Sequence, residues 1–256
     1  MSGHLPRPTK LAHAGQSAWP PFTGDGCLSA SPEAGRRLEF IYRRLFDHFG
    51  PRGWWPGDSP FEVMAGAILT QNTAWRNVEK AVANLSAAGL LSAEAMFAAS
   101  HEALAQAIRP SGYFNVKARR LKALAELILA NGRGGARPEL LDWPQERLRP
   151  ALLGVIGVGP ETADCIVLYA AGQPSFVVDA YTRRILARHG LARGDESYQD
   201  LRAWFMRHLE PESRLYNEYH ALIVAVGHQR CGPRRPRCPS CPLSDDPLLD
   251  KALLEI

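Results

Sequence analysis

The amino-acid sequence predicts an all-α protein, and three observations support this. Apolar residues recur at helical spacing in many segments, as Leu38, Ile41 and Leu45 do in one of them. Serine-proline pairs at 31–32 and 59–60 stand directly before such segments, which is typical of a helix N-terminus. No region shows the sustained apolar-polar alternation of a strand, and no internal repeat is present.

Each expected helix is bounded by its own sequence signals. In chain order we expect helices over 32–50, 59–69, 75–85, 93–99, 101–108, 117–128, 143–153, 160–170, 179–186, 198–209 and 215–226. Gly50 ends the first, and Gly112 breaks the chain before the basic helix that starts near Lys117. Residues 1–32 hold many proline, glycine and serine residues without an apolar period, and we expect a flexible tail there.

Composition limits the class of protein. The chain has 256 residues, a hydrophobic content of 46% and a net charge of +4, so it is long enough for one or two cores and mildly basic. It contains no apolar run long enough to span a membrane and no secretory signal. Five cysteines, three of them clustered near the end, do not form a disulfide framework, so we expect a cytoplasmic protein.

The segment Gly157-Val158-Gly159-Pro160 joins two predicted helices by a tight turn. Two glycines around a small apolar residue permit positive φ and close approach of another backbone. Proline suits the first turn of the second helix, whose unpaired amides can hold a phosphate oxygen. The alternative is an ordinary corner between two helices.

Asp179 follows an apolar run and opens a helix. It is therefore a candidate N-cap, and an ionised carboxylate there is also a candidate catalytic group. Trp54 and Trp55 lie in a loop rich in proline and glycine, and Trp75 begins a later helix. These three indoles either cover the core or form a stacking wall for a nucleobase.

Cys231, Cys238 and Cys241 lie in a loop rich in proline and arginine. Thiols this close together indicate a metal site, because zinc and iron–sulfur clusters both use cysteine ligands. Cys165 is expected in the core, and Cys27 lies in the tail.

Taken together, these motifs resemble the helix-hairpin-helix DNA glycosylases of the endonuclease III superfamily, over about residues 35–245. The motifs are A-I-L-T-Q-N-T, G-Y-F-N-x-K-A, the G-V-G hairpin, V-V-D and the cysteine loop. The resemblance implies that the hairpin grips the DNA backbone and that Gln71 enters the duplex where the base has left. It also implies that Asp179 acts at the sugar of a flipped nucleotide. The DNA-binding set expected on this basis is Gln71, Lys117, Gly157, Val158, Gly159 and Thr162.

The cysteine loop resembles the iron–sulfur signature C-x6-C-x2-C-x5-C of that family, with one departure. The fourth position is Pro247 instead of cysteine. Asp245 or Asp246 is a candidate oxygen ligand, with His228 a weaker one. Three options follow: a [4Fe-4S] cluster with one non-cysteine ligand, a zinc site, or a loop without metal.

Glu161 stands where the lyase-active members of the family carry lysine. A carboxylate forms no Schiff base, so weak or absent lyase activity is expected. The segments W-W-P and R-P-S-G-Y-F-N look more like the monofunctional 3-methyladenine glycosylases of this type. The resemblance thus implies hydrolysis of the N-glycosidic bond of alkylated purines in base excision repair, with Asp179 and Glu161 catalytic and Trp54, Trp55 and Trp75 around the base.

The family resemblance also implies two helical lobes and a central cleft. Residues 60–165 would form a barrel-like bundle that ends in the hairpin, and 33–58 with 166–256 the lobe that carries the cysteine loop. The expected partner is double-stranded DNA with a damaged base, bound by a monomer in the cytoplasm at the nucleoid. Two alternatives remain: an endonuclease III-type lyase acting on oxidised pyrimidines, and a non-catalytic protein that binds damaged DNA.

Overall fold

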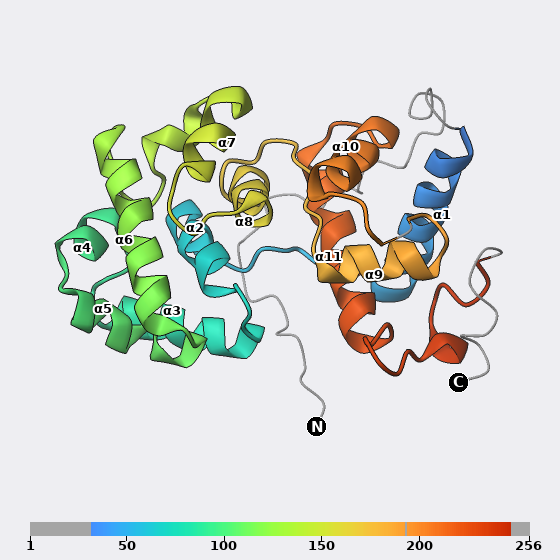
Figure 1. Cartoon of the computed structure of the whole chain (residues 1–256), viewed down its shortest axis with the longest axis horizontal. Coiled ribbons are helices and arrows are strands. Elements are labelled where there is room, and N and C mark those ends of the chain that lie inside the picture. Colours follow the sequence, from blue (N-terminus) through green and yellow to red (C-terminus); the bar gives the residue numbers. More distant parts are fainter. Residues whose placement is uncertain (1–31, 193, 247–256) are drawn as a thin grey trace. The chain divides into compact units, whose positions relative to one another are not determined.

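The computed structural model describes residues 32–192 and 194–246 (Figure 1). The α helices are α1 (Pro32–Phe49), α2 (Pro60–Leu69), α3 (Trp75–Ala87), α4 (Ala93–Ala98), α5 (His101–Ala107), α6 (Phe114–Ala130), α7 (Gln145–Leu153), α8 (Pro160–Cys165), α9 (Ala180–Arg188), α10 (Tyr198–His208) and α11 (Ser213–Gln229). Short 3-10 turns are η1 (Arg109–Ser111), η2 (Glu139–Asp142) and η4 (Cys238–Ser240), and η3 (Ile166–Ala170) is a π-helical turn. The described part of the chain contains no strand, so the all-α class is confirmed there. The predicted tail up to residue 31, Cys27 and Pro247 lie outside the described residues.

The first of two compact units is Trp55–Gln173. It contains α2 to α8, and α2 runs through its core, with Phe61 and every residue from Val63 to Leu69 buried. The unit extends past α8 because Ile166 and Val167 of η3 are fully buried in the same core. Burial of these residues explains why the unit ends at Gln173 and not at the expected residue 165.

The second unit contains the described residues up to Trp54 and from Pro174 onward. It consists of α1, α9, α10 and α11, with α11 in contact with both α1 and α9. Phe176 stacks on Phe205 at 3.8 Å between ring centroids, and the Tyr219 hydroxyl donates to Leu38 O at 2.8 Å. These contacts join segments that are far apart in the chain into one core. The cleft expected between the two units stays a prediction.

Side-chain caps explain where several helices begin. Ser59, Ser92, Ser100 and Ser197 each accept a hydrogen bond from a backbone N–H in the first turn of the helix that follows. Pro60 then occupies the first turn of α2, as the sequence predicts. No helix in the described ranges has both the length and the apolar character needed to cross a bilayer.

Candidate active site and nucleic-acid interface

The hairpin between α7 and α8 has the backbone geometry that its glycines predict. Gly157 has φ +79°, and a Cβ at this position would overlap the Arg120 side chain. Val158 is buried and its N–H donates to Val155 O, so its side chain anchors the turn in the core. Among the described residues, the N–H groups of Gly157 and Gly159 donate no hydrogen bond. The hairpin therefore presents two backbone donors for a ligand.

Gln71 joins α2 to the hairpin. Its Nε2 donates to Gly157 O at 3.0 Å and to the Thr162 hydroxyl at 2.9 Å, and its Oε1 accepts a hydrogen bond from Arg120. Thr162 itself is buried in α8. The structure thus brings together Gln71, Gly157 and Thr162 from the expected DNA-binding set and adds Arg120 to them.

Lys117 has a different place from the one expected. Its side chain is buried, and its ammonium donates to Leu69 O at 2.8 Å, to Ser111 O at 2.8 Å and to the Thr73 hydroxyl at 3.0 Å. Burial, and then the nearby Arg120 charge, lowers the pKa of Lys117 to about 8. This buried position does not favour the DNA contact expected of Lys117; its ammonium instead joins α2, α6 and η1 inside the unit.

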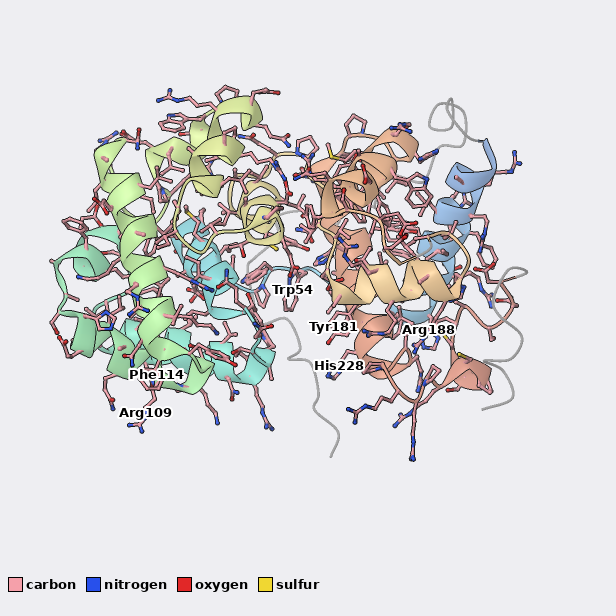
Figure 2. The ribbon with its side chains drawn as sticks, viewed as in Figure 1. Trp54, Arg109, Phe114, Tyr181, Arg188 and His228 are labelled. Carbon is pink, nitrogen blue, oxygen red and sulfur yellow. The ribbon has the colours of Figure 1, made fainter. Side chains whose placement is uncertain are left out.

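Two of the three predicted pocket indoles pair in the first unit. Trp55 and Trp75 meet edge to face with 5.2 Å between ring centroids, and Tyr169 lies 5.4 Å from Trp55. Gly66 lets Trp55 lie against α2, since a Cβ there would sit 3.2 Å from the indole. All three rings are half-buried and pack against the core. Trp54 belongs to the second unit (Figure 2).

Asp179 caps α9, which confirms the N-cap prediction. Its Oδ1 accepts from Thr182 N at 2.7 Å and from the Thr182 hydroxyl at 2.8 Å, and its Oδ2 lies 3.6 Å from His220 Nε2. Burial raises the pKa of Asp179, but the ion pair with His220, together with the hydrogen bonds from Thr182, outweighs it and lowers the pKa below its usual value. The carboxylate is therefore ionised at neutral pH.

Glu161 lies exposed in the first turn of α8. An acidic side chain is favourable there because it faces the positive end of the helix dipole. Three residues later, buried Asp164 is held by Arg149 through two hydrogen bonds of 2.8 and 2.9 Å. Of the two carboxylates in α8, Glu161 is thus the accessible one.

The three cysteines of the loop line one pocket in the second unit. This pocket encloses about 330 Å³, including its open mouth, and its other lining residues are Ile185, Arg188, His189, Val226, Arg230 and Leu243. Arg184 and Arg188 of α9 hold the loop. Arg184 donates to Cys231 O at 2.7 Å, and Arg188, which is labelled in Figure 2, donates to Cys231 Sγ at 3.0 Å. The three thiols thus line one pocket, but the described residues contain no group of three histidine, cysteine or acidic side chains placed to hold a metal ion, so the metal site stays a prediction.

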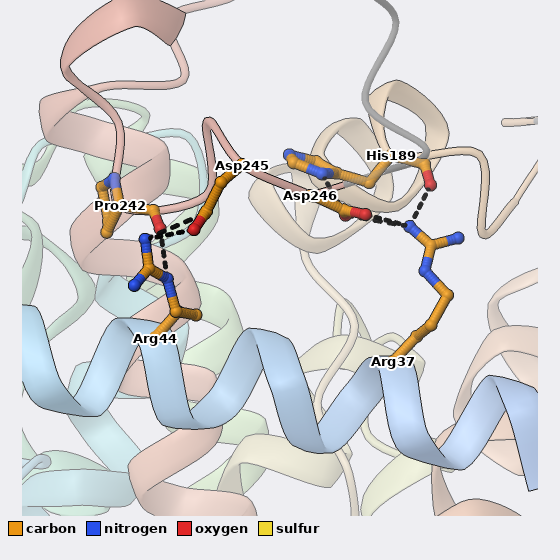
Figure 3. Close-up of polar contacts among 6 residues, drawn as sticks. All are labelled: Arg37, Arg44, His189, Pro242, Asp245 and Asp246. Carbon is orange, nitrogen blue, oxygen red and sulfur yellow. Dashed lines mark hydrogen bonds and ion pairs between the residues drawn. The ribbon is translucent and has the colours of Figure 1, made fainter.

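The acidic candidates for a fourth ligand lie elsewhere. Asp245 pairs with Arg44 at 2.8 Å, and Asp246 pairs with Arg37 at 2.9 Å, both from α1 (Figure 3). Neither carboxylate lines the cysteine pocket, and neither does His228. Their placement does not support a role as metal ligand, because each aspartate is already paired with a cation.

Four residues at these sites carry no distinct sequence signal. Arg120, Tyr169, His189 and His220 each sit in an ordinary helical pattern, so nothing local separates them from solvated or core positions. Their roles depend on partners far along the chain, such as Gln71 for Arg120, 49 residues away.

Comparison with known proteins agrees with this geometry. Residues 65–211 match the model of the HhH-GPD superfamily base excision DNA repair protein. A Methanocaldococcus jannaschii protein described as a "putative DNA repair glycosylase" is 40% identical over 205 residues, which cover 80% of this chain and 93% of that protein. A crystal structure of an H. pylori 3-methyladenine DNA glycosylase bound to 1,N6-ethenoadenine has a TM-score of 0.65 at 28% identity, over 77% of this chain and 97% of that one.

A structure of a non-covalent endonuclease III–DNA complex has a TM-score of 0.72 over 85% of this chain and 95% of that chain. At 24% identity this likeness concerns the fold alone. The family match covers more than half of the sequence and includes the hairpin and Asp179. The chain therefore belongs to the HhH-GPD superfamily of base excision DNA repair proteins, as a helix-hairpin-helix DNA glycosylase of the endonuclease III superfamily.

Proposed function

We propose that this DNA glycosylase is monofunctional and releases alkylated purines from double-stranded DNA. The observation that carries the proposal is Glu161, which lies exposed in the first turn of α8, where the lyase-active members of the family carry lysine. A carboxylate forms no Schiff base with the sugar, so the product would be an uncut abasic site. The likeness to the H. pylori 3-methyladenine glycosylase, at 28% identity, supports the same substrate class.

The hairpin is the proposed phosphate contact. The N–H groups of Gly157 and Gly159 make no hydrogen bond in the described part of the chain, and they precede a helix whose dipole favours an anion. Gln71, fixed beside them by its hydrogen bonds to Gly157 and Thr162, is the proposed group that fills the duplex after the base leaves. Arg120 adds a positive charge beside this group.

Asp179 is the proposed catalytic carboxylate. Breaking an N-glycosidic bond builds positive charge on the sugar, and an ionised carboxylate stabilises that charge or activates the attacking water. Because the pKa of Asp179 is lowered, the ionised form is available at neutral pH. Glu161 is proposed as a second, lesser contributor to rate or base choice.

Trp55 and Trp75 are the proposed wall of the base pocket, with Tyr169 beside them and Trp54 as a further candidate. Flipping a base costs a few kcal/mol, which stacking on aromatic rings offsets. A cationic alkylated purine gains about 0.5–2 kcal/mol more over an indole face. Such bases are already good leaving groups, so little acid catalysis is required.

A [4Fe-4S] cluster is the proposed cofactor, and the support for it is that three cysteines and a histidine line one pocket. Burial, and then Cys231 and Cys238 nearby, raises the pKa of Cys241 to about 11, so this thiol is protonated at neutral pH and would lose its proton only to a bound cation. The described residues contain no group of three histidine, cysteine or acidic side chains already placed to hold a metal ion, so cluster binding would require the loop to adjust around it. Held by Cys231, Cys238 and Cys241, the cluster would crosslink the loop to α11.

One observation favours a second candidate function. An endonuclease III from Sulfolobus acidocaldarius is 27% identical over 186 residues, which cover 72% of this chain and 80% of that protein, so a lyase-active glycosylase on oxidised pyrimidines, using another amine, is the alternative.

The test is base release from duplexes that each carry one lesion. We expect release of 3-methyladenine or 1,N6-ethenoadenine, with the DNA strand left uncut until alkali is added. Release of an oxidised pyrimidine with direct strand cleavage would support the alternative. DNA binding without release of any base would favour a non-catalytic protein.

A further inference from the structure

Besides the three cysteines, the cysteine pocket is lined by a histidine, which can bind metal, and not by either of the expected aspartates. His189, at the C-terminal end of α9, lines the pocket with Cys231, Cys238 and Cys241. It is 4% exposed, so it is almost as well buried as the core around it. The other lining residues are apolar or are arginines, and neither kind binds a metal cation.

The Nδ1 atom of the His189 ring is held by a carboxylate. Its Nδ1 lies 2.6 Å from Asp246 Oδ2, and Asp246 is in turn held by Arg37 at 2.9 Å (Figure 3). Within the described residues, His189 Nε2 makes no hydrogen bond. A neutral imidazole that donates from Nδ1 to a carboxylate has the Nε2 lone pair available, and this is the usual arrangement of a metal-bound histidine.

This arrangement also gives Asp246 a role. The sequence places it directly before Pro247, where the cysteine signature lacks its fourth thiol. Its carboxylate is paired with Arg37, so it does not reach the metal itself. Through its contact with Nδ1 it would orient the His189 ring toward the pocket.

We propose that His189, through Nε2, is the fourth ligand of the cluster held by the three cysteines, with Asp246 as its positioning residue. This inference rests on the proposed [4Fe-4S] cofactor. It replaces the missing fourth cysteine with a side chain from α9, so that the cluster would join α9 to the loop.

The test uses the full chain purified without oxygen, with histidine labelled by ¹⁵N. Iron and sulfide are measured first. The cluster is then reduced, and pulsed electron paramagnetic resonance is used to detect coupling between the cluster and a histidine nitrogen. The variants are His189→Cys, His189→Ala and Asp246→Asn, with His208→Ala as the control. His208 is also buried in the second unit, but lies outside the pocket.

We expect the wild type and His208→Ala to show the nitrogen coupling. His189→Cys should keep four irons and lose the coupling, because a thiolate restores the four-cysteine set. His189→Ala should lose one iron and give the signal of a three-iron cluster, and Asp246→Asn should change the coupling constant. Circular dichroism checks that each variant is folded.

Two results are unfavourable, and they differ in meaning. A wild type that holds the cluster without histidine coupling, or coupling that persists in His189→Cys, overturns the ligand and leaves the cofactor intact. A wild type without iron and sulfide overturns the proposed cofactor and this inference together.

Discussion

His220 Nε2 lies 3.6 Å from Asp179 Oδ2, while Thr182 donates two hydrogen bonds to Oδ1. The carboxylate at the start of α9 is thus held on both oxygens, one by its own helix and one by α11. Burial alone would raise the pKa of Asp179, and these contacts lower it. The ionised state of the proposed catalytic group therefore depends on His220, a residue of another helix that lies far along the chain.

Replacing His220 should move the acid limb of the pH profile. In His220→Leu the burial remains while the ion pair is lost, so the pKa of Asp179 rises. We expect the fall of kcat/KM on acidification to begin at a higher pH than in the wild type, with His208→Leu as the control. In the wild type, ionised Asp179 also stabilises the fold above its usual pKa, and this contribution is lost as the pH falls through the lowered value. An unchanged acid limb would remove His220 from this role.

Asp179→Asn should separate capping from catalysis. Asparagine is as good an N-cap as aspartate, so the fold and most DNA binding should be retained. Base release should fall by roughly 10²–10⁴-fold, the range for losing one positioned acid–base group. Single-turnover kinetics and thermal melts measure the two effects. A fully active variant would leave Asp179 with the cap role alone.

Borohydride trapping should distinguish the monofunctional mechanism from the lyase mechanism. We expect no covalent adduct between the wild-type protein and damaged DNA, because the accessible position in α8 is Glu161. Glu161→Lys is the positive control, since it restores an amine where the lyase-active relatives carry one. A gel-shifted adduct with the wild type would restore the lyase alternative.

Lys117 and Arg119 form a matched pair in α6, one buried and one exposed. Lys117→Ala leaves three acceptors without their donor, so we expect the free energy of unfolding to fall by about 1–3 kcal/mol. The salt slope, which is the dependence of DNA affinity on salt concentration, should stay unchanged because Lys117 is buried. Arg119→Ala should keep the stability of the wild type. If Arg119 contacts phosphate, the slope of log affinity against log salt concentration should fall in magnitude by about 1.

The lowered pKa of Lys117 adds a pH test to this comparison. Above about pH 8 the unfolded chain binds more protons at this lysine than the folded protein does, so wild-type stability rises with pH at this site. The stability difference between the wild type and Lys117→Ala should therefore grow between pH 7 and 9, as measured by urea unfolding. A constant difference would mean that the buried lysine titrates normally.

Gly159→Ala tests the hairpin as a phosphate contact. Gly159 has φ −88°, and no atom lies within 4 Å of a Cβ added there, so the folded protein tolerates the change. We expect an unchanged melting temperature and DNA binding weakened by about tenfold, or about 1.4 kcal/mol, because the methyl group keeps the phosphate from the backbone. Gly157→Ala should instead destabilise the fold, through its positive φ and its overlap with Arg120. Unaltered binding by Gly159→Ala would place the DNA backbone elsewhere.

The sequence by itself determined the helices and the motifs at their ends. Helical spacing of apolar residues and serine or aspartate caps are local signals, and they predicted the class, the turn at Gly157 and the cap at Asp179. The order of motifs along the chain was enough to indicate the glycosylase family, which the match over residues 65–211 establishes.

The tertiary structure decided which way the charged side chains face. Lys117 belongs to a basic run, yet it is buried because Leu69, 48 residues away, presents a carbonyl oxygen to it. Asp246 is close in sequence to the cysteines, yet it pairs with Arg37 and His189 from helices 209 and 57 residues away. A periodic pattern shows that a residue lies on a helix, but the partner that desolvates or neutralises its charge comes from another helix. Only the packing of those helices determines whether such a residue meets solvent, a counter-ion or a metal.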